Sequence, residues 1–309
     1  MLRRDFLKGI AFTALAAGLL KRLPLGAAVK EGESCDLVAV RGKDPGDMFD
    51  LAIAALGGMG AFVKKGQSVL VKPNIGWNSE PEKGADTNPQ LVGRIVKRAL
   101  EAGASKVIVF DHTCDSDWAS CYKRSGIREA VEKAGGVMVT GNDKNAYRQV
   151  EIKGAKVMKQ ALVHPALLEA DVVINVPVLK NHGGATMTCA MKNYMGVVWD
   201  RRWMHKNSLE QSIADSVLIR KPDLNVVDAY LVMTHGGPTG RSARSRSVKM
   251  NSLLASRDIL AIDTASAKLL GVTMPANRNY LEKGAELKLG ESDLKKLKIK
   301  RIVAPEKMS

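Results

Sequence analysis

Four short polar clusters stand out in this chain, because each follows an apolar run and each carries side chains that can do chemistry. They are Lys72-Pro73-Asn74, Asp111-His112-Thr113-Cys114, Lys180-Asn181-His182 and Asp228-Ala229-Tyr230. Lysine donates hydrogen bonds to anions, asparagine both donates and accepts, and histidine and aspartate transfer protons. If the fold gathers these clusters, they indicate a site for a small carboxylate or phosphate. Turn chemistry at strand ends is the alternative interpretation of the same residues.

A further polar segment follows Gly183-Gly184, and its spacing predicts a helix over residues 186–195. Cys189, Lys192 and Asn193 stand at i, i+3 and i+4, so they would share one face of that helix. Glycines before a helix leave backbone N–H groups free, which favours an anion at its N-terminus. The expected substrate-binding residues are Lys72, Asn74, Lys180, Asn181, Lys192 and Asn193. The expected catalytic residues are His182 and Asp111 for proton transfer, and Cys189 as nucleophile, ligand or redox group.

Metal binding is an open alternative for some of these residues. The candidate ligands are His112, Cys114 and Cys189, which have suitable donor atoms but match no zinc-finger or metalloprotease spacing. None of the four cysteines stands in a Cys-x-x-Cys pattern, so the chain lacks the clustered cysteines of a ferredoxin-like iron–sulfur site. Cys114 and Cys121 are close enough in sequence for a local disulfide, or they stay free. The identity of any cofactor stays undetermined.

Several common enzyme classes are not indicated. The sequence has no Gly-x-Ser-x-Gly elbow, no phosphate-binding loop ending in Gly-Lys-Ser/Thr, and no Gly-x-Gly-x-x-Gly after a strand. The formal net charge is +15, and about +11 remains once the five basic and one acidic side chains of residues 1–28 are set aside. This excess favours an anionic small molecule or an anionic surface as partner, and general basicity for solubility is the alternative.

The elements that must position these residues alternate between strand and helix. Short β-branched runs predict strands over residues 37–40, 67–72, 106–110, 137–139, 171–176 and 224–227. Helical spacing covers residues 47–56, 89–102, 125–134 and 259–269, with Asn88 as a cap of the second helix. This alternation predicts an α/β fold: a mostly parallel open sheet with helices on both faces, in one domain over residues 35–309. The carboxyl ends of its strands would share one edge, where ligands bind.

The first 28 residues have the layout of an export signal. Arg3-Arg4 with Asp5, Phe6, Leu7 and Lys8 form a twin-arginine motif, an apolar run follows over residues 9–20, and cleavage is expected near Ala28. The run is too short to span a bilayer, which needs about 20 residues, although a short membrane anchor is the alternative. We expect a periplasmic or other extracytoplasmic protein that is exported by the twin-arginine machinery. Nucleic acid is not an expected partner in that location.

Several motifs resemble one known family. Lys72-Pro73-Asn74, Thr87-Asn88-Pro89, Asn175-Val176-Pro177 and Thr188-Cys189-Ala190-Met191-Lys192-Asn193 with Gly196 are similar to the domain-of-unknown-function family 362, from about residue 69 to residue 271. The resemblance implies no settled activity. Many members of the family carry iron–sulfur segments or twin-arginine signals, and this chain departs from the ferredoxin-like members because it lacks their clustered cysteines.

Two classes of function are compatible with these observations. The first is an enzyme that binds an anionic small molecule in a basic crevice, and its chemistry is proton transfer beside a carboxylate or redox chemistry with a cofactor. The second is a non-catalytic exported module that binds a ligand or docks on a redox partner. The clustering of ionisable residues at strand ends favours the enzyme.

Overall fold

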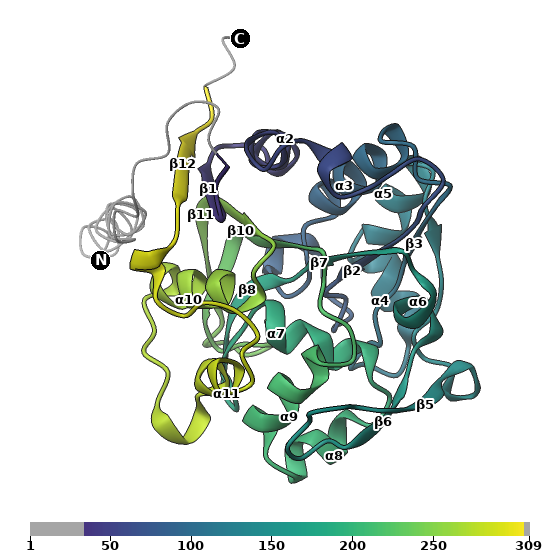
Figure 1. The fold of residues 1–309 in the computed structure, drawn as a ribbon, viewed down its shortest axis with the longest axis vertical. Helices are drawn as coiled ribbons and strands as arrows, with labels where there is room; N and C mark the ends of the chain where they lie inside the picture. Colours follow the sequence, from purple (N-terminus) through teal and green to yellow (C-terminus); the bar gives the residue numbers. More distant parts are fainter. Residues whose placement is uncertain (1–33, 306–309) are drawn as a thin grey trace.

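A ten-stranded sheet forms the centre of the structure, a computed structural model that describes residues 34–305 (Figure 1). Its main path runs β12 (Ile299–Val303), β1 (Leu37–Arg41), β11 (Arg246–Ser256), β10 (Leu224–His235), β7 (Val172–Val176), β2 (Ser68–Pro73), β3 (Lys106–Val109) and β4 (Val137–Met138). All pairs from β10 to β4 are parallel, as is β1 with β12, whereas β11 is antiparallel to both of its neighbours. This confirms the predicted mostly parallel α/β sheet.

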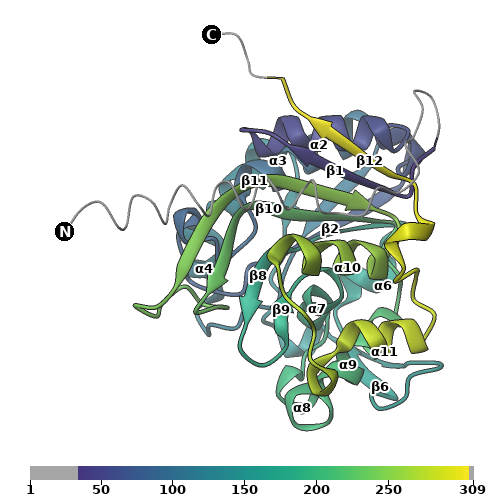
Figure 2. The same ribbon diagram turned by 90° about the vertical axis from the view of Figure 1, so that its left-hand side faces the viewer.

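Helices cover both faces of the sheet. Figure 2 shows α2 and α3 on one side and α7, α9, α10 and α11 on the other. The α-helices are α2 (Pro45–Ala55), α3 (Pro89–Glu101), α4 (Trp118–Arg124), α5 (Ile127–Lys133), α6 (Pro165–Glu169), α7 (Ala190–Asn193), α8 (Arg201–Lys206), α9 (Leu209–Val217), α10 (Ile259–Leu270) and α11 (Tyr280–Glu286). The short 3₁₀ helices are η1 (Met59–Ala61), η2 (Pro81–Lys83), η3 (Lys144–Ala146), η4 (Tyr194–Val197), η5 (Ala276–Arg278) and η6 (Leu294–Lys296).

Burial on two faces explains the continuous apolar runs that predicted the strands. In β1, Leu37 and Ala39 belong to the core beneath α10, whereas Val38 and Val40 belong to the core beneath α2 and α3. Successive side chains of a strand point to opposite faces, so a strand between two helical layers must be apolar at every position. The predicted cap of α3 is also confirmed, because the Asn88 side chain accepts a hydrogen bond from Gln90 N.

One prediction about a central strand was wrong. The predicted strand over residues 224–227 continues to His235, so Asp228 lies within β10 and not at its end. Its carboxylate accepts hydrogen bonds from Asn88 N at 2.7 Å and Tyr230 N at 3.0 Å. The predicted helix over residues 125–134 is confirmed as α5, which begins after Gly126 with a φ of 70°, and the separate helix α4 precedes it. Residues 236–245 form a loop between β10 and β11, and β5 (Arg148–Glu151) pairs with β6 (Gln160–Val163) in a separate hairpin.

The segment after β7 differs most from prediction. Where a helix was expected over residues 186–195, β8 (Val178–His182) turns at Gly183-Gly184 and pairs with β9 (Thr186–Thr188). Only Ala190–Asn193 is α-helical, and η4 follows it.

The predicted signal over residues 1–28 lies outside the described residues. Within residues 34–305, no helix is both long and apolar enough to cross a membrane.

Candidate functional site

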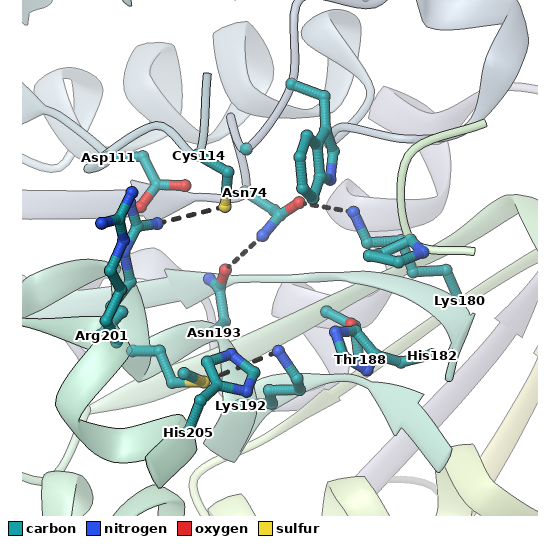
Figure 3. Close-up of a pocket in the computed structure, with 16 residues that line it drawn as sticks. Asn74, Asp111, Cys114, Lys180, His182, Thr188, Lys192, Asn193, Arg201 and His205 are labelled. Atoms are coloured by element: carbon teal, nitrogen blue, oxygen red, sulfur yellow. Dashed lines mark hydrogen bonds between the residues drawn. The ribbon is translucent and has the colours of Figure 1, made fainter. Parts of the chain in front are cut away.

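A pocket of about 410 Å³ opens at the carboxyl ends of β2 and β3 (Figure 3). β8 contributes Lys180 and His182 to one wall, and α7 contributes Lys192 and Asn193 to another. The remaining lining residues are Asn74, Gly76, Trp77, Asp111, Cys114, Thr188, Met195, Gly196, Arg201, Arg202, His205 and Pro238. The topology therefore brings together three of the four predicted polar clusters, and the fourth, around Asp228, lies elsewhere.

A buried ion pair forms the base of this site. Lys72 Nζ lies 2.7 Å from Asp111 Oδ1, and both side chains are almost completely buried. Asp111 Oδ2 accepts a hydrogen bond from Ile75 N at 2.7 Å, and Lys72 Nζ also donates to Pro73 O at 2.8 Å. Burial lowers the pKa of Lys72, and the Asp111 charge opposes that shift. Lys72 was predicted to bind substrate, but its ammonium neutralises Asp111 and it does not line the cavity.

A chain of amide hydrogen bonds connects the ion pair to Lys180. Asn193 donates from Nδ2 to Lys72 O at 3.1 Å and to Asn175 Oδ1 at 2.9 Å. Its Oδ1 accepts from Asn74 Nδ2 at 3.1 Å, and Asn74 Oδ1 accepts in turn from Lys180 Nζ at 2.9 Å. Because every amide has a defined partner, the network holds Lys180 in place at the edge of the pocket.

Asp86 is a buried carboxylate that the sequence analysis missed. It accepts hydrogen bonds from Gly76 N at 2.8 Å and Trp77 N at 3.1 Å. Burial raises the pKa of Asp86 to about 7 despite the nearby Lys180, and burial lowers the pKa of Lys180 to about 8 despite Asp86. The position of Asp86 directly before the Thr87-Asn88-Pro89 motif was the sequence signal that could have identified it as a residue of the site.

Lys192 and Arg201 are among the cations of the pocket that have no carboxylate partner within residues 34–305. Lys192 Nζ has one hydrogen-bond partner there, the Met195 Sδ atom at 3.6 Å. Arg201 donates to His112 O at 2.7 Å, to Thr113 O at 2.6 Å and to Cys114 Sγ at 3.3 Å. Burial lowers the pKa of Lys192 to about 8, and the positive charges of Lys180 and Arg201 act in the same direction. Arg201 was not among the predicted site residues, because the residues around it form no recognisable motif.

His182 is held as a neutral imidazole. Its Nδ1 accepts hydrogen bonds from Gly184 N at 3.0 Å and Ala185 N at 3.1 Å, which assigns the ring proton to Nε2. Burial, followed by the charges of Lys192 and Lys180, lowers its pKa to about 2. His182 can therefore donate a hydrogen bond to a ligand, but it is a weak base.

Asn181 and Cys189 are not brought to the pocket. The Asn181 Nδ2 atom faces Thr186 O at 3.5 Å, within the β8–β9 hairpin. Cys189 is fully buried beside Asp263, and burial raises the pKa of its thiol well above the ordinary value. A buried thiol of this kind is a poor nucleophile, because the thiolate is the reactive form.

The prediction of an anion site at the N-terminus of the helix after Gly183-Gly184 was also wrong. Asp263 accepts hydrogen bonds from Ala190 N at 2.6 Å and Met191 N at 3.0 Å, so a side chain of α10 already caps α7. The first backbone N–H groups of this helix are therefore not available to a ligand.

The candidate metal ligands are separated. His112 stacks on Trp199 with ring centroids 4.6 Å apart, Cys114 contacts Arg201, and Cys189 is buried beside Asp263. Among the residues that the structure describes, no group of three or more His, Cys, Asp or Glu side chains is placed to hold a metal ion. Cys114 and Cys121 are both free thiols, so the structure contains no disulfide between them.

Gly196 allows the wall of the pocket to approach the ion pair. A Cβ atom at this position would lie 2.0 Å from Asp111 Oδ1 and 2.8 Å from Lys72 Nζ. We expect Gly196→Ala to lower the free energy of unfolding by about 1–3 kcal/mol, because overpacking forces buried side chains to shift. Urea unfolding measures this loss. Gly183→Ala is the control, since a Cβ there meets nothing within 4 Å, and equal effects of both substitutions would contradict the prediction.

Comparison with known proteins gives relatives at several levels of similarity. A curated thylakoid-associated protein of Synechocystis sp. is 29% identical over 231 residues, which cover 70% of this chain and 66% of that protein. The lactate racemase apoprotein of Thermoanaerobacterium thermosaccharolyticum has a TM-score of 0.39 at 11% identity, over 69% of this chain and 54% of its own. A structural-genomics protein of Thermotoga maritima has a TM-score of 0.44 at 13% identity, over 74% and 59%. The chain thus spans less than two thirds of the length of each of these three proteins.

The family assignment rests on a match to residues 69–268, which contain most of the pocket. This range includes the motifs from Lys72 to Gly196 on which the resemblance was based. The chain therefore belongs to the family described as domain of unknown function, DUF362.

Proposed function

We propose that the pocket binds a small carboxylate or phosphate and that the protein is an enzyme acting on this anion. The supporting observation is the charge of the lining, which contains Lys180, Lys192, Arg201 and Arg202 but one carboxylate, Asp111. That carboxylate is already paired with Lys72.

The physical argument concerns cations that are partly shielded from water and have no counter-charge nearby. A buried charge is costly unless it is paired, and attraction between charges strengthens as the effective dielectric falls. Lys192 and Arg201 have no carboxylate partner within residues 34–305, so an anionic ligand would supply the missing counter-charge. The ligand would accept hydrogen bonds from these cations, which are among the stronger hydrogen bonds in proteins.

The enzymatic part of the proposal rests on His182 and Asp111, which both line the pocket. In this proposal the His182 Nε2–H donates a hydrogen bond to a ligand oxygen, and Asp111 is the carboxylate nearest to the reacting group. The alternative is a non-catalytic binding module. That alternative is favoured by the full engagement of Asp111 with Lys72 and Ile75 N, and turnover of a bound compound would decide against it.

The location of the protein belongs to the same proposal. The twin-arginine pattern of residues 3–8 supports export by the twin-arginine machinery to the periplasm or another extracytoplasmic compartment. In such a compartment a redox partner is a further candidate, whereas nucleic acid is not. The net positive charge of the chain is compatible with an anionic ligand.

Removal of the Lys192 charge tests the binding proposal. We expect Lys192→Met to weaken binding of inorganic phosphate by about 10–100-fold, since a hydrogen bond to a charged group contributes about 1.5–3 kcal/mol. Isothermal titration calorimetry measures the affinity, and the melting temperature should stay nearly constant because Lys192 contacts only Met195 Sδ by hydrogen bonding.

Lys268→Met is the matched control, because it removes the same charge from an exposed position on α10. This variant should bind phosphate as the unmodified protein does. Absence of phosphate and acetate binding to the unmodified protein, or equal affinities of the two variants, would refute the proposal.

A further inference from the structure

The amine of Lys192 differs from the other cationic groups around the pocket. Lys72 is bound to Asp111, and Lys180 is bound to Asn74 Oδ1 and Ala85 O. Arg201 donates to two backbone carbonyls. Within residues 34–305, the one hydrogen-bond partner of Lys192 Nζ is a thioether sulfur at 3.6 Å, which is a weak acceptor, and Lys192 lines the cavity. Of these four cations, Lys192 is therefore the one that can approach a ligand without breaking a strong hydrogen bond within the described residues.

The surroundings of this amine also favour its neutral form. Burial lowers the pKa of Lys192 to about 8, the Cys114 thiol opposes the shift, and Lys180 and Arg201 reinforce it. His182 and His205 are the other titratable groups coupled to Lys192, and burial lowers the pKa of both, so both favour the neutral imidazole. A lysine that is desolvated beside other cations is a nucleophile near neutral pH, because a substantial fraction of it carries a free electron pair.

We infer that Lys192 Nζ is a nucleophile that forms a Schiff base with the carbonyl carbon of a small 2-oxo acid bound in the pocket. The inference rests on the proposed function, because the carboxylate of this ligand would occupy the anion site. Lys180 and Arg201 supply positive charge for that carboxylate, and a 2-oxo acid places its carbonyl directly beside it. The cavity of about 410 Å³ is large enough for such a compound.

The reaction balances without a further reagent. The Lys192 nitrogen forms a bond to the carbonyl carbon, and the carbonyl oxygen becomes the hydroxyl of a carbinolamine. That oxygen then leaves as water, with both hydrogens derived from the amine, and a carbon–nitrogen double bond remains. The neutral imidazole of His182 can donate a hydrogen bond to the oxygen before it leaves.

Trapping with a reductant tests the inference. The full chain is incubated with pyruvate and cyanoborohydride, digested and analysed by mass spectrometry. We expect one dominant adduct on Lys192, with the mass of one pyruvate less one water plus two hydrogens, and at least tenfold less labelling of any other lysine. Inorganic phosphate should compete with this labelling, because both ligands would occupy one anion site.

Lys192→Arg separates nucleophilicity from charge. This variant keeps a cation, so it should still bind phosphate, but it should give no adduct because a guanidinium stays protonated. Phosphate binding without a Lys192 adduct would refute the Schiff base and leave the proposed function intact. Equal labelling of exposed lysines would also refute the Schiff base. Absence of binding of both phosphate and pyruvate would refute the proposed function itself.

Discussion

Replacement of Lys72 by methionine should lower the free energy of unfolding by about 3–5 kcal/mol, the typical cost when one partner of a buried ion pair is removed. Methionine fills a similar volume, so little of the loss would come from a cavity. The Asp111 carboxylate would keep the hydrogen bond from Ile75 N but would lose its counter-charge while it stays almost completely buried. Urea or guanidinium unfolding followed by circular dichroism measures the change.

The chain offers a matched control for this loss. Lys133 and Glu129 form an ion pair of similar length, 2.5 Å, but their side chains are 73% and 70% exposed. Lys133→Met should cost less than about 1 kcal/mol, because exposed ion pairs contribute little. The double variant Lys72→Met/Asp111→Leu should be more stable than Lys72→Met alone, since no buried charge remains unpaired. A Lys72→Met variant as stable as Lys133→Met would show that the buried pair does not contribute as argued.

The affinity of the pocket for sulfate should fall steeply as the pH rises above about 8. Lys192 and Lys180 both have pKa values lowered to about 8, so each is cationic below that pH and neutral above it. Ionisation of Asp86 near pH 7 adds a negative charge and acts in the same direction. Each lysine that contributes to binding would reduce the affinity up to tenfold per pH unit, whereas an ordinary lysine would remain charged to about pH 10.

Sulfate is the suitable probe because its own charge does not change over this range. Calorimetric titrations between pH 6 and 10 measure the profile, and Lys192→Arg is the informative variant because arginine stays protonated throughout. The sulfate affinity of this variant should fall less steeply with rising pH than that of the unmodified protein, because one titrating lysine has been removed. A constant affinity up to pH 10 in the unmodified protein would show that neither lysine titrates as argued.

The sequence predicted the parallel part of the sheet well, because burial on both faces leaves a continuous apolar run such as the one in β7. The hairpin of β8 and β9 was not predicted, because the helical spacing of Cys189, Lys192 and Asn193 led us to begin the helix at residue 186, within what is β9. There, the start of α7 is determined by Asp263, a side chain 73 positions away from Ala190. Local spacing contains no information about such a distant cap.

The sequence predicted where the candidate site lies in the fold, but it did not predict which side chains contact one another there. Strand ends identified Asn74, Lys180 and Asp111 as neighbours, and the structure places all three around one cavity. The pairing of Lys72 with Asp111 and the isolation of Lys192 depend on differences of a few ångströms in side-chain position. Residue types along a chain do not encode such differences in any readable pattern.

The amide chain of the site links parts of the protein that are distant in sequence. Asn193 contacts Lys72 across 121 positions, and Lys180 contacts Asn74 across 106. Contacts of such long range form late and slowly, because large loops must close before they contribute stability. Partly folded chains would therefore lack the ability to bind an anion, and ligand binding would report that the whole central sheet has assembled. Under the proposed twin-arginine export, which carries folded proteins, such an assembled site would already exist on the inner side of the membrane.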